Sequence, residues 1–201
     1  MAHSADISRR ILITGAPGTG KTTLIRRVCD VLKHEFPNLN ISGFYTEEVR
    51  DVRSGQRVGF DVIDIISNRR APLASSTIGS PPGGPRVGKY AVLLNEFEPL
   101  AMECLSIDNQ KMKNRLIVID EIGKMESLSI KFCKDVERLF DQARNLDLAI
   151  LASVPIDKGH GLPQIVNKVK QACGHRSITV TRENRDRLVL EVKELVLKAI
   201  G

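Results

Sequence analysis

Apolar positions along this chain recur with two periods, and the changes of period predict the order of its elements. A short apolar run over residues 10–14 ends at a glycine, and apolar residues then recur three and four positions apart up to about residue 36. We therefore expect a buried strand, a glycine turn and an amphipathic helix that ends before Pro37. Further strands are expected over 116–119, 148–153 and 177–180, and helices over 127–144, 162–172 and 183–200. Strands that alternate with helices predict a mostly parallel sheet with helices on both faces.

The middle of the chain has a different pattern. Two β-rich runs at 41–49 and 58–66 flank a turn at Ser54 and Gly55, which predicts a hairpin. This β-rich stretch has no linker on either side. We therefore expect one domain over residues 1–201, with a β-rich insert at about 41–94.

The second half of this insert begins with a loop rich in glycine and proline over residues 79–85. This loop is a candidate lid. A strand is expected over 87–94, and the capping-box-like pair Asn95 and Glu98 predicts the start of a short helix.

Composition narrows the class of protein. The chain has 201 residues, of which 42% are apolar and 27% charged, as in ordinary globular proteins. It has no apolar stretch long enough to cross a membrane, and residues 1–10 lack the features of a secretory signal. Four cysteines lie at scattered positions without metal-ligand or disulfide-framework spacing. We therefore expect a cytoplasmic protein with no membrane partner.

Charge is concentrated in one stretch. The net charge is +6, and residues 50–89 carry seven basic but only three acidic side chains. This stretch could be a solvated face, an anion-binding surface or a nucleic-acid footprint. Aromatic residues are only 4% of the chain and tryptophan is absent, which leaves few platforms for stacking nucleic-acid bases.

The strongest functional signal is a complete GxxxxGK[ST] pattern between the first strand and the first helix. Its members are Gly15, Ala16, Pro17, Gly18, Thr19, Gly20, Lys21 and Thr22. Glycines let backbone amides curl around phosphate oxygens, and the helix N-terminus adds unpaired N–H groups and partial positive charge. Lys21 is expected to reach the β and γ phosphates, and Thr22 to place its hydroxyl on Mg²⁺. The pattern therefore predicts a Walker A loop that binds a nucleotide, with Mg²⁺ as cofactor.

Two carboxylates follow the apolar run 116–119 and complete the predicted catalytic set. Asp120 is the expected Walker B residue, which holds the metal together with Thr22. Glu121 comes next and is expected to orient and deprotonate an attacking water. The predicted catalytic residues are thus Lys21, Asp120 and Glu121.

Five segments in this order resemble the cancer-related nucleoside-triphosphatase family, which includes nucleotide phosphatases of thermophiles. They are residues 15–22, 43–50 (GFYTEEVR), 59–62, 118–126 (VIDEIGKME) and 181–185. The resemblance implies a P-loop NTPase fold, an α/β three-layer sandwich similar to RecA-type and kinase-like domains. It also implies a Mg²⁺-dependent hydrolase that removes the terminal phosphate of ATP, GTP, CTP and UTP with low base selectivity. The nucleotide contacts that it implies extend to Leu116, Ile117, Val118, Ile119, Asp120, Glu121, Ile122 and Gly123.

Weaker candidates lie outside these motifs. Arg50 or Arg57 could act as an arginine finger that stabilises charge on the transferred phosphoryl group, and a solvated arginine is the alternative for each. Asn184 and Arg185 follow the last predicted strand, where P-loop folds often contact the base. The alternative there is a helix cap by Thr181.

Two other functions fit the same motifs. A nucleotide or small-molecule kinase would need an acceptor pocket with its own arginines, which residues 50–89 could supply. A nucleotide-dependent nucleic-acid-binding module would use the same basic stretch. We expect the hydrolase, acting as a monomer on nucleoside triphosphates and without a nucleic-acid partner.

Overall fold

The computed structural model describes residues 9–78, 83–107, 115–143, 148–157, 159 and 161–201. Within these ranges nine strands form one sheet, in the order β5-β6-β4-β3-β2-β7-β8-β1-β9. Residues 79–82 of the candidate lid and the predicted helix end at Arg144 lie outside the described residues. No helix of the described ranges is long and apolar enough to cross a membrane.

Five parallel strands make up one side of this sheet. They are β2 (Asn40–Arg50), β7 (Arg115–Asp120), β8 (Leu148–Pro155), β1 (Arg10–Gly15) and β9 (Ile178–Thr179). Each neighbouring pair among them is parallel. In the register, Gly15 lies opposite Pro155 and Ile119 opposite Ala152, so β1, β7 and β8 end at the same edge. Loops that leave these strands therefore meet at that edge, where ligands bind in open α/β sheets.

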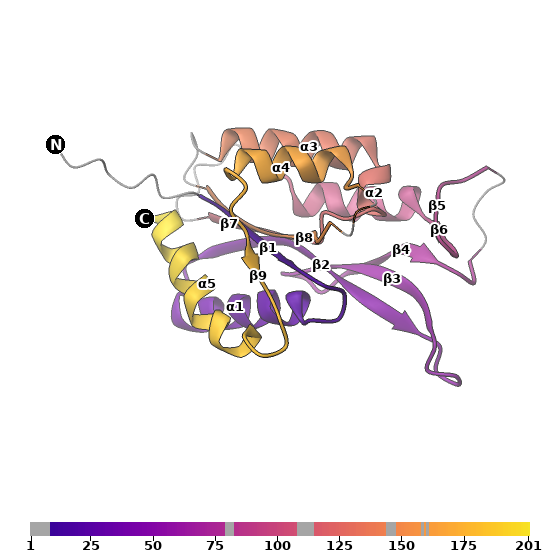
Figure 1. Ribbon diagram of the computed structural model, residues 1–201, viewed down its shortest axis with the longest axis horizontal. Coiled ribbons are helices and arrows are strands. Elements are labelled where there is room, and N and C mark those ends of the chain that lie inside the picture. The colour runs from indigo at the N-terminus through magenta and orange to yellow at the C-terminus, as the bar shows by residue number, and fades with distance from the viewer. Residues whose placement is uncertain (1–8, 79–82, 108–114, 144–147, 158, 160) are drawn as a thin grey trace.

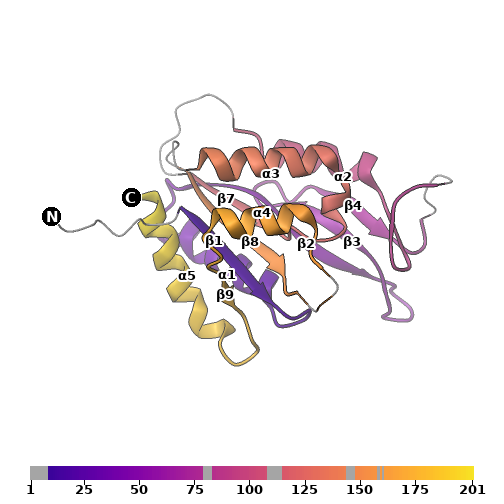
Figure 2. The same cartoon turned by 45° about the horizontal axis from the view of Figure 1, so that its top comes forward.

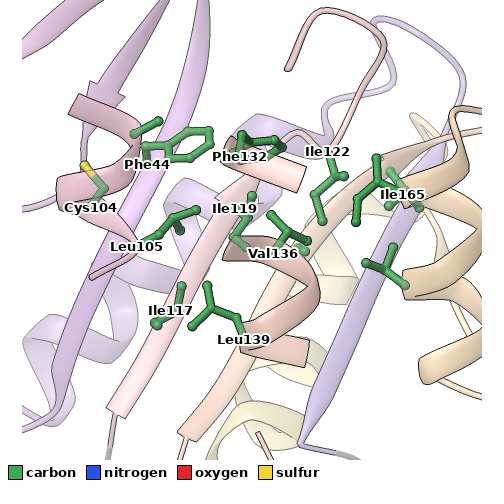
Figure 3. Packing of buried hydrophobic residues seen from close by; sticks show 14 of the residues in the cluster. Phe44, Cys104, Leu105, Ile117, Ile119, Ile122, Phe132, Val136, Leu139 and Ile165 are labelled. Atoms are coloured by element: carbon green, nitrogen blue, oxygen red, sulfur yellow. The ribbon is translucent and has the colours of Figure 1, made fainter. Parts of the chain in front are cut away.

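Helices cover both faces of the parallel strands (Figures 1 and 2). Helices α1 (Lys21–Glu35) and α5 (Arg185–Ile200) lie on one face, and α2 (Leu94–Cys104), α3 (Ile130–Gln142) and α4 (Gln164–Ala172) lie on the other. The buried side chains form two clusters, one on each face. Strand β7 supplies both clusters by alternation, with Ile117 and Ile119 in one and Leu116 and Val118 in the other. Figure 3 shows the first of these clusters, where β7 packs against α3. The predicted three-layer α/β sandwich is thus confirmed.

Antiparallel strands extend the sheet beyond β2. They are β3 (Arg57–Asp64), β4 (Arg70–Ser75), β6 (Tyr90–Val92) and β5 (Arg86–Val87). The predicted hairpin is confirmed, because β2 pairs with β3 and the turn between them is closed by backbone hydrogen bonds from Asp51 to Gln56 and from Gly55 to Asp51. This hairpin reaches out from the body of the molecule in Figure 1. The phosphate loop follows a strand of the parallel part, and the antiparallel strands lie beside that part of the sheet, beyond β2.

The expectation of one strand over 87–94 is wrong. The chain instead turns at Gly88, which has a φ of 58°, between the short strands β5 and β6, and α2 already begins at Leu94. Strand β4 is an addition that the sequence pattern did not predict. Its sequence RAPLAS contains Pro72, and a proline inside a run argues against a strand.

Two helix starts also differ from the expectation. Asn95 and Glu98 do not cap α2, which has no side-chain cap. The oxygens of Glu98 instead accept a hydrogen bond from the Ser129 hydroxyl at 2.8 Å and pair with Lys131 at 2.9 Å. Helix α3 begins three residues later than expected, because a 3₁₀ turn at Glu126–Leu128 precedes it and Ser129 caps its first turn. Glu98 thus joins α2 to the start of α3 and is no part of a local cap.

Replacing Ser129 with alanine tests this junction. The Ser129 side chain is fully buried, accepts a hydrogen bond from the Phe132 N–H at 3.0 Å and donates to Glu98. We expect Ser129→Ala to lower the free energy of unfolding by about 1–3 kcal/mol, because it removes a helix cap and a buried hydrogen bond. Urea denaturation measures this loss. The matched variant Ser127→Ala removes an exposed hydroxyl that donates to the Lys124 carbonyl and should cost clearly less. Equal losses would contradict the junction.

Candidate nucleotide site

The loop over residues 15–22, called the phosphate loop here, joins β1 directly to α1. Gly18 and Gly20 have φ values of 75° and 99°, which are left-handed conformations that favour glycine. The N–H and hydroxyl of Thr19 both donate to the Ala16 carbonyl, which closes the loop into a tight turn. A Cβ at Gly20 would also lie 3.0 Å from the Arg185 side chain. Since α1 has no side-chain cap, its first N–H groups face the loop without a side-chain acceptor.

Lys21 lies between the ends of β1 and β7. Its ammonium donates to the Gly15 carbonyl at 3.3 Å and lies 3.4 Å from Oε2 of Glu121. Only 11% of the Lys21 side chain is exposed. The structure therefore brings two of the three predicted catalytic residues into direct contact.

Asp120, the third, ends β7 and is almost completely buried. Its Oδ1 accepts a hydrogen bond from the Ser153 hydroxyl of β8, and its Oδ2 accepts no well-formed hydrogen bond within the described part of the chain. Burial raises the pKa of Asp120 to about 6, although the Ser153 and Thr22 hydroxyls favour the charged form. Ser153 was not among the residues expected at the site from the sequence; a serine within a predicted strand that is otherwise apolar was the available signal.

Glu126 is a further carboxyl group of this region that the sequence motifs did not predict. It is 5% exposed, and its Oε2 accepts a hydrogen bond from the Gly123 N–H at 3.1 Å. Burial and the negative charge of Glu121 raise the pKa of Glu126 to about 8. A Cβ at Gly123 would lie 2.8 Å from Glu126 and 2.9 Å from Glu121. Because Gly123 has no side chain, it leaves room for the carboxyl groups of both Glu121 and Glu126.

A cavity of about 490 Å³ opens at this edge of the sheet. Gly15, Pro17, Lys21 and Thr22 line it from the phosphate loop, and Glu121 and Glu126 line it from the segment after β7. Its volume lies within the usual range of sites for small molecules. Of the groups that the motifs predicted, Lys21, Thr22 and Glu121 line this cavity, whereas Asp120 is not among its lining residues in the described ranges.

The remaining predicted contacts lie elsewhere. The side chains of Leu116, Ile117, Val118, Ile119 and Ile122 are fully buried in the two core clusters. They anchor β7 and so set the position of Asp120. These five side chains are therefore too deeply buried to contact a nucleotide directly.

The candidates at the last strand are divided between two roles. The Asn184 side chain accepts a hydrogen bond from the Thr181 N–H at 2.8 Å and donates to the Thr179 carbonyl at 2.9 Å, so it holds the loop before α5. The Thr181 hydroxyl accepts from the Asn184 N–H at 3.3 Å. Arg185 packs at the Gly20 position of the phosphate loop. The Arg185 side chain therefore lies against the phosphate loop, whereas the Asn184 amide is bonded to the loop before α5.

The two arginine-finger candidates also separate. Arg57 lines the cavity, whereas Arg50 pairs with Glu48 at 2.5 Å and donates to the Gly55 carbonyl within the hairpin. Four basic side chains of the stretch 50–89 form ion pairs with carboxylates, and these are Arg50, Arg57, Arg69 and Arg70. Much of the positive charge that suggested an anion-binding or nucleic-acid surface is thus balanced locally.

A metal ion would find oxygen donors here. Asp120 supplies a buried carboxylate oxygen without a hydrogen-bond partner in the described ranges, and Thr22 supplies a hydroxyl. No three His, Cys, Asp or Glu side chains of these ranges gather as metal ligands. Such a donor set fits a hard cation that completes its shell with phosphate oxygens and water, as Mg²⁺ does.

Comparison with known proteins gives the family. A family model described as NTPase matches residues 10–193. The chain belongs to the NTPase family. This confirms the resemblance on which the sequence-based expectations partly depended.

Individual relatives of the NTPase family cover nearly all of the chain. The human cancer-related nucleoside-triphosphatase is 38% identical over 194 residues, which are 92% of this chain and 95% of that protein. Nucleoside-triphosphatase THEP1 of Thermotoga petrophila is 36% identical over 91% of this chain and 90% of its own. The solution structure of a human cancer-related nucleoside triphosphatase superposes with a TM-score of 0.76 at 37% identity, covering 94% of this chain and 98% of that one. The crystal structure of THEP1 from Aquifex aeolicus gives 0.72 at 31% identity, covering 93% and 98%.

Glu126→Gln tests whether the buried Glu126 carboxyl group lowers the stability of the fold when it is ionised. The pKa of Glu126 rises from an ordinary value of 4.5 to about 8 on folding. The folded state therefore binds the proton more tightly, and the contribution of Glu126 to stability falls as the pH rises from 4.5 through 8. Glutamine stays neutral and can still accept from the Gly123 N–H. We expect the variant to be more stable than wild type above about pH 8, with a difference that shrinks towards about pH 5.

Urea unfolding across this pH range, in the presence of a chelator, measures the difference. Glu191→Gln, which replaces an exposed glutamate of α5, is the matched control and should show no such trend. A stability difference for Glu126→Gln that is independent of pH would contradict the raised pKa.

Proposed function

We propose that this chain hydrolyses the terminal phosphate of ATP, GTP, CTP and UTP with little selectivity for the base and depends on Mg²⁺. The observation that carries the proposal is the placement of the Lys21 ammonium between the Gly15 carbonyl and Glu121, beside the buried carboxylate of Asp120. The names of the human and Thermotoga petrophila relatives, both nucleoside-triphosphatases, support the reaction class.

The phosphate loop binds the triphosphate through its backbone and Lys21. The unpaired N–H groups at the start of α1 attract anionic oxygens, and the helix dipole adds partial positive charge. Lys21 is held within reach by the Gly15 carbonyl and exchanges its contact with Glu121 for phosphate oxygens when the nucleotide binds. Because phosphoryl transfer depends mainly on position and charge, this arrangement favours cleavage of the terminal phosphate.

Asp120 and Thr22 are the residues that would hold Mg²⁺. When bound, Mg²⁺ neutralises charge on the phosphate oxygens. The hydrogen bond from Ser153 fixes the Asp120 carboxylate so that its Oδ2 remains available. Thr22, one residue after Lys21, presents a neutral oxygen from the first turn of α1.

Glu121 is the proposed general base. Its side chain is 29% exposed and lines the cavity, so a water molecule can reach its carboxylate. The carboxylate accepts a proton as the water oxygen attacks the terminal phosphorus. Low base selectivity is supported by the loop before α5, where the Asn184 amide is already engaged in hydrogen bonds to the backbone.

Phosphate release by purified protein with Mg²⁺ and each of the four triphosphates tests the proposal. We expect turnover of all four to fall by about 10²-fold or more in Lys21→Ala and in Glu121→Gln, while Glu121→Gln still binds nucleotide. Lys134→Ala on α3 and Glu191→Gln on α5 remove exposed groups of the same types and should retain activity. Hydrolysis by Glu121→Gln at the wild-type rate would exclude Glu121 as the base.

Omitting Mg²⁺ is the second arm of this experiment. Activity that persists with a chelator present would contradict the proposed roles of Thr22 and Asp120. A strong preference for one triphosphate would contradict the base tolerance and leave the hydrolysis itself intact.

A further inference from the structure

We propose that the cavity beside the phosphate loop binds a second molecule, a planar hydroxyl-bearing compound of about nucleoside size, and that its hydroxyl can accept the terminal phosphate in place of water. The proposal rests on the proposed function for the nucleotide and its phosphates. It gives a role to the part of the cavity wall that does not bind the phosphates.

Most of this wall comes from the β2–β3 hairpin and from the antiparallel strands beyond it. Thr46 and Glu48 on β2, Phe60 on β3, Leu73 on β4 and Val87 on β5 all line the same cavity as Lys21 and Glu121. In Figure 1, β3, β4 and β5 lie beyond β2, on the side of the sheet that faces away from β9 and α5. The cavity therefore extends from the phosphate loop, past Glu121, onto the insert.

The surface of this extension is largely apolar. Phe60, Val87, Met125 and Leu162 line the cavity, and each is a partly buried side chain packed against the core cluster of that face. The core thus continues into the cavity wall. An attacking water needs two to four polar partners and gains nothing from such a wall. An organic molecule gains free energy from every apolar surface that it covers there.

One corner of the wall suits a planar ring. Phe60 packs edge-to-face on Tyr90 with ring centroids 5.4 Å apart, and the Arg57 guanidinium lies 5.1 Å from the centre of the Phe60 ring. Arg57 is held by hydrogen bonds to the Tyr90 hydroxyl at 3.1 Å and to Glu48 at 2.8 Å. These contacts are present without a ligand, and contacts made in advance reduce the entropy lost on binding. The aromatic and cationic faces favour stacking, and the Glu48 carboxylate can accept a hydrogen bond from a ligand hydroxyl.

Glu121 contacts Lys21 and lines the same cavity as this wall, so one base can serve both nucleophiles. In the transfer, the acceptor hydroxyl gives its proton to the Glu121 carboxylate, and its oxygen forms a bond to the terminal phosphorus. The bond from that phosphorus to the bridging oxygen breaks, and the nucleoside diphosphate leaves with the electron pair. The products are a phosphorylated acceptor and a diphosphate. Hydrolysis is the same step with water as the nucleophile.

The nucleotide base does not require this wall. Arg185 packs at Gly20, where α1 begins, and it is absent from the residues that line the cavity in the described ranges. A base near the loop before α5 would leave Phe60 and Val87 uncovered.

The test uses the full chain with Mg²⁺ and ATP labelled in its terminal phosphate. The probes are the four ribonucleosides and two aromatic alcohols, 2-phenylethanol and tryptophol, each compared with a reaction that contains no acceptor. Labelled organic phosphate and free phosphate are separated by chromatography. We expect at least one probe to become labelled, with a matching fall in free phosphate.

Variants of the wall connect this transfer with the cavity. Phe60→Ala should raise the KM for the acceptor by about tenfold or more, as expected for a lost stacking platform, and leave phosphate release without acceptor within about twofold of wild type. Val87→Glu places a charge in the same wall from a short outer strand and should act in the same direction. Phe36→Ala, which removes a partly exposed phenylalanine outside this cavity, is the matched control.

The outcomes separate the two proposals. Normal phosphate release with no labelled product from any probe overturns the acceptor site and leaves the hydrolase standing. Labelled product that Phe60→Ala and Val87→Glu do not reduce also overturns the site. Labelled product without phosphate release in the acceptor-free reaction supports the acceptor site and contradicts the proposed hydrolase.

Discussion

The buried carboxylate of Asp120 is the constraint around which the site is built. An ionised carboxyl group without solvent is costly, and here only the Ser153 hydroxyl and the nearby Thr22 and Lys21 offset part of that cost. The carboxylate stays in place because β7 is central in the sheet and its four apolar residues supply both core clusters. Packing in the two hydrophobic clusters therefore fixes β7 and, at its end, the carboxylate of Asp120 next to the phosphate loop.

The parallel and antiparallel parts of the sheet contribute different groups to the cavity. A helix connection lets the next strand run in the same direction as the one before it. The parallel strands therefore end at one edge of the sheet, where the phosphate loop, Glu121 and Ser153 lie. Antiparallel strands beyond β2 need no crossover helix, so they add a wall directly beside that edge. The wall carries the ion pair of Glu48 and Arg57 on an apolar background. The proposed phosphate site and the proposed acceptor site thus lie at the two ends of one cavity.

Local pattern and tertiary contact competed at several positions. The spacing of Asn95 and Glu98 suits a capping box, yet Glu98 bonds Ser129 of the next helix, since α2 and α3 pack together on one face. Likewise the arginines of the insert suggested a basic surface. In the folded protein Arg69 and Arg70 meet Glu103 and Glu47, which lie 34 and 23 positions away in the chain. Periodicity and composition contain no information about such distant partners.

By itself the sequence determined the order of strands and helices in the α/β layers, the phosphate loop and the two carboxylates at the end of β7. These features depend on neighbouring residues, because hydrophobic period, glycine conformation and the chemistry of a contiguous motif are local properties. Only the tertiary structure decided that Ser153 restrains Asp120, that Glu126 lies buried beside Glu121, and that Arg57 and not Arg50 reaches the cavity. Each of these results from strand register and packing, which bring residues together according to how the layers fit and not according to their separation along the chain.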